Sequence, residues 1–187
     1  MSTSFGTLCP ARVVGYKALG TDLDTSADIA RTQLAAATDY IWVPLIQYTG
    51  ALTNSGVFPA LTFDDAAQKY GRGTIQLPQG YGSGIVSIVI PWYTAATTGN
   101  CKWIVDVASI AAAAALTSEN QQTVVTAANG TGTRLILSTV SFTASYFASG
   151  DLIGVQVSRD GADVLDTISA DAFIAGCGVY LSLAMRG

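Results

Sequence analysis

The chain has 187 residues and a net charge of −4; only 12% of its residues are charged, 50% are hydrophobic, and histidine is absent. A typical soluble domain carries about 25% charged residues, so we expect part of this surface to be buried against other subunits. The nine lysine and arginine residues are scattered singly, which argues against nucleic-acid binding because phosphate contacts need grouped basic side chains.

The sequence also bears on membranes and compartment. A transmembrane helix needs about 18 or more uninterrupted apolar residues, and the longest candidate, residues 104–116, is broken by Asp106 and Ser109. The first twenty residues lack the apolar core of a secretory signal. The three cysteines form no CxxC pair, which favours free thiols in a reducing cytosol. We therefore expect no membrane span and assembly in a reducing cytosol.

Residues 1–55 differ from the rest of the chain and predict an N-terminal arm. Residues 28–38 fit either a short helix, capped by Ser26, or an extended segment. Residues 40–48, YIWVPLIQY, have the composition of a strand. Pro44 lacks a ladder donor, so this strand should lie at a sheet edge or rest on another surface.

From residue 57 onward, strand patterns alternate with turn sequences such as TTGN, NGTG and RDGAD. The predicted strands are 57–63, 70–77, 84–93, 102–110, 121–127, 133–143, 151–159 and 172–185. In the third strand Val86, Ile88, Ile90 and Trp92 share one face. The alanine run at 111–115 is too short for a stable isolated helix and predicts a loop or a single helical turn.

Eight strands without intervening helices predict an all-β, antiparallel sandwich over residues 56–187. A jelly roll has eight strands. An immunoglobulin-like sandwich is the alternative, but the spacing of Cys101, Trp103 and Cys177 does not match its cysteine–tryptophan–cysteine core. The sequence therefore predicts an eight-stranded jelly roll preceded by an extended arm.

The closing stretch, residues 150–185, predicts two strands joined by an aspartate-rich loop. In the second strand every odd position is apolar: Phe173, Ala175, Cys177, Val179, Leu181, Leu183 and Met185. This period of two predicts one continuous strand whose odd face lies in the core. The even face, which includes Tyr180, is nearly uncharged, and we expect another subunit or the arm to cover it.

The acidic residues favour turns over catalysis. Asp64 and Asp65 are adjacent at a strand end and should point to opposite faces, unlike a general acid–base pair. The loop aspartates Asp160, Asp163, Asp166 and Asp171 could in principle hold calcium, but their spacing does not fit an EF-hand. Backbone-bonded turns and a surface ion pair with Arg159 explain them better.

The remaining candidates for chemistry also favour structural roles. Without histidine, the many serines and threonines lack the usual oriented base. Cys177 fits a buried structural thiol, and GYGSG at 80–84 fits a hairpin turn. Trp42, Trp92 and Trp103 could stack on a sugar, but core or subunit-interface packing is favoured. We therefore expect no enzyme, catalytic residue, cofactor, metal or small-molecule substrate.

Several short motifs, taken in order, resemble a β-sandwich domain of tailed-bacteriophage virion proteins. They are Phe63-Asp64, Leu77-Pro78, Trp92-Tyr93, Gly99-Asn100, Trp103, Gly150-Asp151 and Arg159-Asp160. The resemblance covers residues 57–187 and leaves the first fifty-odd residues outside.

The resemblance implies a structural role in the virion, as in capsid decoration (cement) proteins, head fibres or tail-fibre modules, which are typically homotrimers. We expect a decoration protein on the capsid surface that binds the major capsid protein; a tail-fibre or receptor-binding module is the alternative. The residues expected at the capsid or subunit interface are Tyr40, Trp42, Val43, Leu45, Ile46, Tyr48 and Tyr180.

Overall fold

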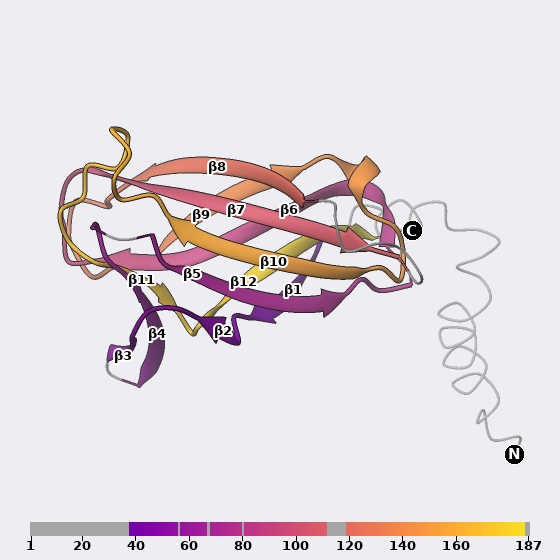
Figure 1. Ribbon diagram of the computed structural model, residues 1–187, viewed down its shortest axis with the longest axis horizontal. Helices are drawn as coiled ribbons and strands as arrows, with labels where there is room; N and C mark the ends of the chain where they lie inside the picture. Colours follow the sequence, from indigo (N-terminus) through magenta and orange to yellow (C-terminus); the bar gives the residue numbers. More distant parts are fainter. Residues whose placement is uncertain (1–37, 56, 67, 80, 112–118, 186–187) are drawn as a thin grey trace, which may run out of the picture.

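The computed structural model describes residues 38–55, 57–66, 68–79, 81–111 and 119–185 (Figure 1). The strands of this part are β1 (Thr38–Pro44), β2 (Gln47–Tyr48), β3 (Leu52–Ser55), β4 (Phe58–Phe63), β5 (Tyr70–Gln76), β6 (Tyr81–Thr94), β7 (Asn100–Ile110), β8 (Glu119–Ala127), β9 (Ile136–Phe142), β10 (Leu152–Arg159), β11 (Ala172–Ala175) and β12 (Gly178–Met185). A 3₁₀ turn, η2 (Ala144–Tyr146), follows β9. No helix in the described part has the length and apolarity needed to cross a bilayer.

The strands form two packed antiparallel sheets (Figure 1). The five-stranded sheet has the order β2-β5-β10-β7-β8. In the seven-stranded sheet the order is β1-β12-β6-β11-β4-β3, and β9 pairs with β6 as well. Both β11 and β12 pair with the long strand β6, β12 around Val89 and β11 around Tyr93. This architecture confirms the predicted all-β jelly-roll sandwich.

The core lies between the sheets and follows the predicted alternation. Along β7, Cys101, Trp103, Val105 and Val107 are buried, and the residues between them are half-buried. The inward face of β6 carries Val86, Ile88, Ile90 and Trp92, as predicted. Aromatic rings join the two layers, because the ring of Trp103 lies 5.3 Å from that of Phe63 and 5.7 Å from that of Trp92.

The closing segment differs from the prediction of one continuous strand. A turn at Gly176 and Cys177, whose φ angles are 73° and 58°, divides it into β11 and β12. Two residues in the left-handed region interrupt the alternation, so the inward positions are even in β11 and odd in β12. The prediction that Phe173 and Ala175 belong to the core face was wrong, and Cys177, in the turn, is only partly buried against the core. The buried residues are Ala172 and Ile174, then Val179, Leu181 and Leu183.

The N-terminal segment joins the sandwich earlier than predicted. Strand β1 pairs with β12 at the end of the seven-stranded sheet, so Pro44 lies on an edge strand as expected. Strand β2 pairs with β5 in the five-stranded sheet, and β3 pairs with β4 in the seven-stranded sheet. Residues 38–55 are therefore part of the sandwich, although the predicted arm extends to residue 55. The possible helix at 28–38 and most of the alanine run at 111–115 lie outside the described residues.

Candidate interaction site

Three exposed aromatic residues gather on the outer face of the seven-stranded sheet, and we call them the outer aromatic surface: Tyr40, Trp42 and Tyr180. Trp42 of β1 lies directly opposite Tyr180 of β12, with ring centroids 4.8 Å apart in an edge-on arrangement. Their exposed fractions are 37% and 38%, and that of Tyr40 is 64%. The alternation of β1 that buries Val43 turns Tyr40 and Trp42 outward.

Glycines beside the Trp42 indole give it room on this face. A Cβ added to Gly178 would fall 2.6 Å from Trp42 Cε2 and 2.7 Å from the Val43 carbonyl oxygen. A Cβ at Gly176 would lie 3.2 Å from Trp42 Cη2. Because Gly176 and Gly178 carry no side chain, β1 can pack against the start of β12 and place the Trp42 indole against Tyr180.

Substituting Gly178 with alanine should lower the free energy of unfolding by about 1–3 kcal/mol, because the added methyl overpacks against Trp42 and the backbone of β1. Chemical denaturation followed by tryptophan fluorescence would measure the loss. Gly154→Ala is the matched control: its Cβ would meet only Ala108, at 4.0 Å, so it should be neutral or slightly stabilising. Equal destabilisation by both substitutions would contradict the packing argument.

A second aromatic pair lies on the same outer face. Tyr93 of β6 is opposite Phe173 of β11, and their rings stack with centroids 5.0 Å apart and planes 16° apart. The outward positions between and beside the two pairs are uncharged. Val89 and Pro91 are already buried within the chain, and the exposed or half-buried positions are Ser87, Leu137, Thr139, Ser141 and Ser182. This broad uncharged face is typical of a contact surface rather than of a solvated sheet.

The other residues predicted for the interface occupy different places. Val43 and Leu45 are buried in the core, so they cannot meet a partner directly. Ile46 is exposed, but it lies beside the five-stranded sheet. Tyr48 is half-buried with its ring 5.4 Å from Phe63, and desolvation raises the pKa of its hydroxyl. Only Tyr40, Trp42 and Tyr180 of the predicted set come together on one surface.

The prediction missed the pair formed by Tyr93 and Phe173. A signal for Tyr93 was present, because Trp92 was assigned to the inward face of its strand and the next residue must then point outward. Phe173 was missed because the turn at Gly176 and Cys177 was not foreseen and Phe173 was placed in the core.

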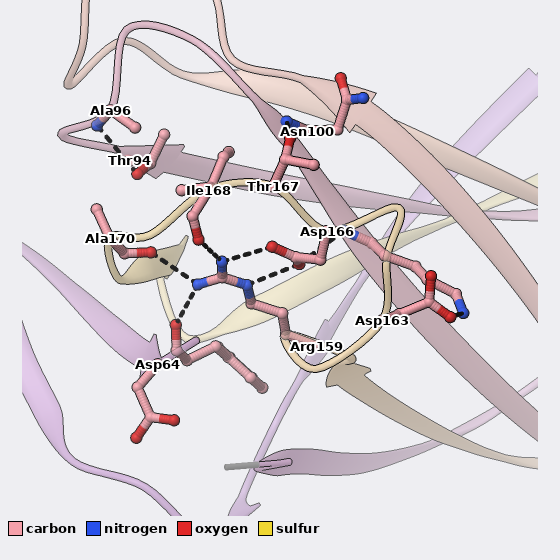
Figure 2. A network of polar contacts seen from close by, with 12 residues as sticks. Asp64, Thr94, Ala96, Asn100, Arg159, Asp163, Asp166, Thr167, Ile168 and Ala170 are labelled. Carbon is pink, nitrogen blue, oxygen red and sulfur yellow. Dashed lines mark hydrogen bonds and ion pairs between the residues drawn. The ribbon is translucent and has the colours of Figure 1, made fainter. Parts of the chain in front are cut away.

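The aspartate-rich loop is held by one buried arginine, shown in Figure 2. Arg159 Nε and Nη2 each bind a different carboxylate oxygen of Asp166, at 2.9 and 2.7 Å. Its Nη1 donates to the carbonyl oxygens of Phe63 and Ala170, at 3.2 and 2.7 Å, and Nη2 also donates to that of Ile168. All five N–H donors of the guanidinium are thus used. The predicted ion pair of Arg159 exists, but it is buried rather than at the surface.

The charges around this pair act on each other and on Cys101. Burial by itself lowers the pKa of Arg159, but its hydrogen bonds with Asp166 raise it above the usual value. Burial raises the pKa of the Cys101 thiol, so this cysteine stays protonated in the folded protein. Asp166 also accepts a hydrogen bond from the Lys102 backbone N–H, at 2.9 Å, which ties the loop to β7. The ion pair of Arg159 and Asp166 therefore fixes residues 160–171 against the sandwich.

The remaining loop carboxylates bind lysine and backbone groups. Lys102 pairs with Asp160 and Asp163, and Asp163 also accepts a hydrogen bond from the Leu165 N–H. The side chain of Asp64 pairs with Lys69 and accepts a hydrogen bond from the Ala66 N–H, consistent with a turn. Over the described residues, no group of three or more acidic or cysteine side chains is arranged to hold a metal ion.

A groove of about 480 Å³ crosses the outer face of the five-stranded sheet. It is lined by residues of β5, β7 and β10, among them Arg72, Asp106 and Gln156, with Ile46 at one end. This volume lies within the range of small-molecule sites. The structure therefore carries two candidate interaction sites, one on each sheet.

No family model and no curated protein matches the chain. Among solved structures, it resembles a family 35 carbohydrate-binding module from an environmental isolate, at 10% identity and a TM-score of 0.44, over 74% of this chain and 96% of that one. It also resembles a xylan-binding module, at 9% identity and a TM-score of 0.43, over 81% and 100%.

A third similar structure is the enzymatically active domain of tailspike protein 4 from bacteriophage CBA120. The identity is 8% and the TM-score 0.41, over 81% of this chain and 20% of that one. Likenesses this distant do not extend to function.

Proposed function

We propose that the protein is a non-catalytic decoration protein of a bacteriophage capsid, attached to the major capsid protein through the outer aromatic surface. The observation that carries the proposal is the contact between Trp42 and Tyr180 at an exposed sheet edge, with Tyr40 beside them. Tyrosine and tryptophan bury large apolar areas at little cost in side-chain entropy, and they are enriched in protein interfaces. The order of motifs that resembles phage virion domains supports the assignment to a virion.

In this proposal attachment requires only the burial of apolar surface between the protein and the major capsid protein. Each square ångström of apolar surface removed from water contributes about 25 cal/mol, and a shell repeats the contact at every lattice position. The low proportion of charged residues suits this role, because few charges would have to be desolvated. In this proposal the protein is a homotrimer, and residues 1–37, which precede β1, reach neighbouring capsid subunits.

Capsid binding tests the proposal. Tyr40→Ser and Tyr180→Ser should each weaken co-sedimentation with capsids of the parent phage from which the native protein has been stripped, by about tenfold or more, because each removes an aromatic contact. Deletion of residues 1–37 should weaken it further while leaving the sandwich folded. The deletion must stop there, because Val43 and Leu45 belong to the core.

Val125→Ser is the matched control. Val125 is 39% exposed, close to the 38% of Tyr180, but it lies on β8 in the five-stranded sheet. It should leave capsid binding unchanged. Full binding by Tyr40→Ser and Tyr180→Ser, with both variants folded, would refute attachment through this surface.

A tail-fibre or receptor-binding module remains the second candidate, and the groove on the other sheet favours it. Copy number in the virion separates the two: hundreds of copies per particle support decoration, whereas about a dozen support a tail tip. Gold labelling of intact particles would give the location, and light scattering after size exclusion would give the oligomeric state.

A further inference from the structure

A continuous row of polar side chains crosses the outer face of the five-stranded sheet. Its members lie opposite one another on successive strands, and we call them the polar row: Gln47, Arg72, Gln156, Asp106 and Gln121. Arg72 Nε donates to Gln156 Oε1 at 2.5 Å, and Gln156 Nε2 donates to Asp106 Oδ2 at 2.9 Å. From the other side, Gln121 Nε2 donates to Asp106 Oδ1 at 2.7 Å. These bonds link the side chains of four members of the row, Arg72, Gln156, Asp106 and Gln121, and so orient them relative to one another.

Small residues lie next to the polar row and form the floor of the groove. Two positions along each strand, Thr74, Gly154 and Ala108 again lie opposite one another. A Cβ at Gly154 would meet only atoms of Ala108, at 4.0 Å, so the space above it is open. The exposed side chain of Ile46 adds an apolar group at one end. The groove therefore has an apolar floor beside a row of hydrogen-bonding groups.

The charges of the polar row favour a neutral ligand. The guanidinium of Arg72 and the carboxylate of Asp106 are joined through Gln156, so the row carries no net charge. Arg72 lies 4.2 Å above the ring of Tyr70, which fixes its plane. Its two Nη groups have no hydrogen-bond partner among the described residues and can donate to a ligand, while the oxygens of Asp106 retain lone pairs that can accept.

A hydroxyl group both donates and accepts hydrogen bonds, so a ligand rich in hydroxyl groups matches the donors and acceptors of the polar row. We propose that the groove binds a neutral oligosaccharide, lying across the strands with its hydroxyl groups on the polar row and its C–H surface on Gly154 and Ala108. The site is separate from the outer aromatic surface, so this binding goes beyond attachment to a capsid and stands or falls independently of it.

Two other ligand classes fit the groove less well. An extended peptide binds by adding a strand to a sheet edge, but β10 and β7 lie inside the sheet and pair on both sides. A nucleic acid would bring phosphates toward Asp106, on a protein of net charge −4. Neither class would use the polar row as the structure presents it.

Titration calorimetry tests the proposal with cellohexaose, xylohexaose and maltohexaose as neutral probes and a hyaluronan hexasaccharide as the anionic probe. At least one neutral probe should bind saturably. Gly154→Val should weaken that binding at least tenfold, because its side chain fills the floor of the groove. Gln156→Ala should weaken it by about tenfold, the loss expected when a fixed hydrogen-bonding group is removed.

Thr139→Val, on the outer face of the seven-stranded sheet, is the control and should leave binding unchanged. Circular dichroism and the unfolding midpoint establish that each variant is folded, and Gln156→Ala keeps the test valid if Gly154→Val is unstable. The proposal is overturned if no neutral probe binds, if the anionic probe binds more tightly, or if both groove variants bind like the native protein.

Discussion

Replacing Asp166 with asparagine is expected to lower the free energy of unfolding by about 3–5 kcal/mol, because it leaves the buried Arg159 charge without a counter-ion. Both side chains are almost completely buried, so water cannot replace the lost carboxylate. The loop carbonyl oxygens of Ala170 and Ile168 depend on the same guanidinium, and the loop should therefore loosen with it. Urea denaturation, with the slope m checked for constancy, measures the change.

Two further variants make this expectation specific. Asp163→Asn alters the same loop, but the pair of Asp163 with Lys102 is partly exposed to water, so the loss should be smaller. An Arg159→Met/Asp166→Leu double variant removes both charges, which for an isolated pair can be nearly neutral. Here it should remain destabilised, because three carbonyl oxygens lose their donor. Equal losses for Asp166→Asn and Asp163→Asn would contradict the argument that the buried pair of Arg159 and Asp166 is what stabilises the loop.

Alternation along single strands was predictable from sequence because burial on one face of a sheet imposes a period of two. Strand β6 shows this: Ile88, Ile90 and Trp92 were assigned to one face and are buried together. The closing segment shows where this reasoning fails. Cys177 has a φ of 58°, which is uncommon for a residue with a side chain. The glycines on either side of it, Gly176 and Gly178, were a signal for a break in the strand, and the prediction of one continuous strand did not use that signal.

The candidate sites were predictable to different degrees. Tyr40, Trp42 and Tyr180 could be proposed because aromatic residues at outward strand positions are visible in the sequence. The polar row could not, because residues as distant as Gln47, Arg72 and Gln156 meet only through the register of separate strands. The burial of Arg159 was likewise invisible, since its guanidinium is enclosed by the loop that follows it, at Asp166, Ile168 and Ala170, and by the carbonyl of the distant Phe63.

Replacing Trp103 with alanine is the second large effect that we expect, again about 3–5 kcal/mol of lost stability. The Trp103 side chain is fully buried and contacts the rings of Phe63 and Trp92, so its removal leaves a cavity where the two sheets meet. Close-packed neighbours refill such a space only partly. Thermal and urea unfolding should both show the loss, and a change below about 1 kcal/mol would mean that the sheets can collapse onto the cavity.

A comparison of two phenylalanine variants separates packing from hydrogen bonding at this site. Among the described residues, the indole N–H of Trp103 is buried without a hydrogen-bond partner, whereas that of Trp92 donates to Ser138 Oγ at 2.8 Å. Trp103→Phe therefore loses contact area but no hydrogen bond. Trp92→Phe loses both, and it leaves the buried Ser138 oxygen with one partner fewer. Trp92→Phe should thus cost about 1 kcal/mol more than Trp103→Phe, and the reverse order would show that packing alone governs this cluster.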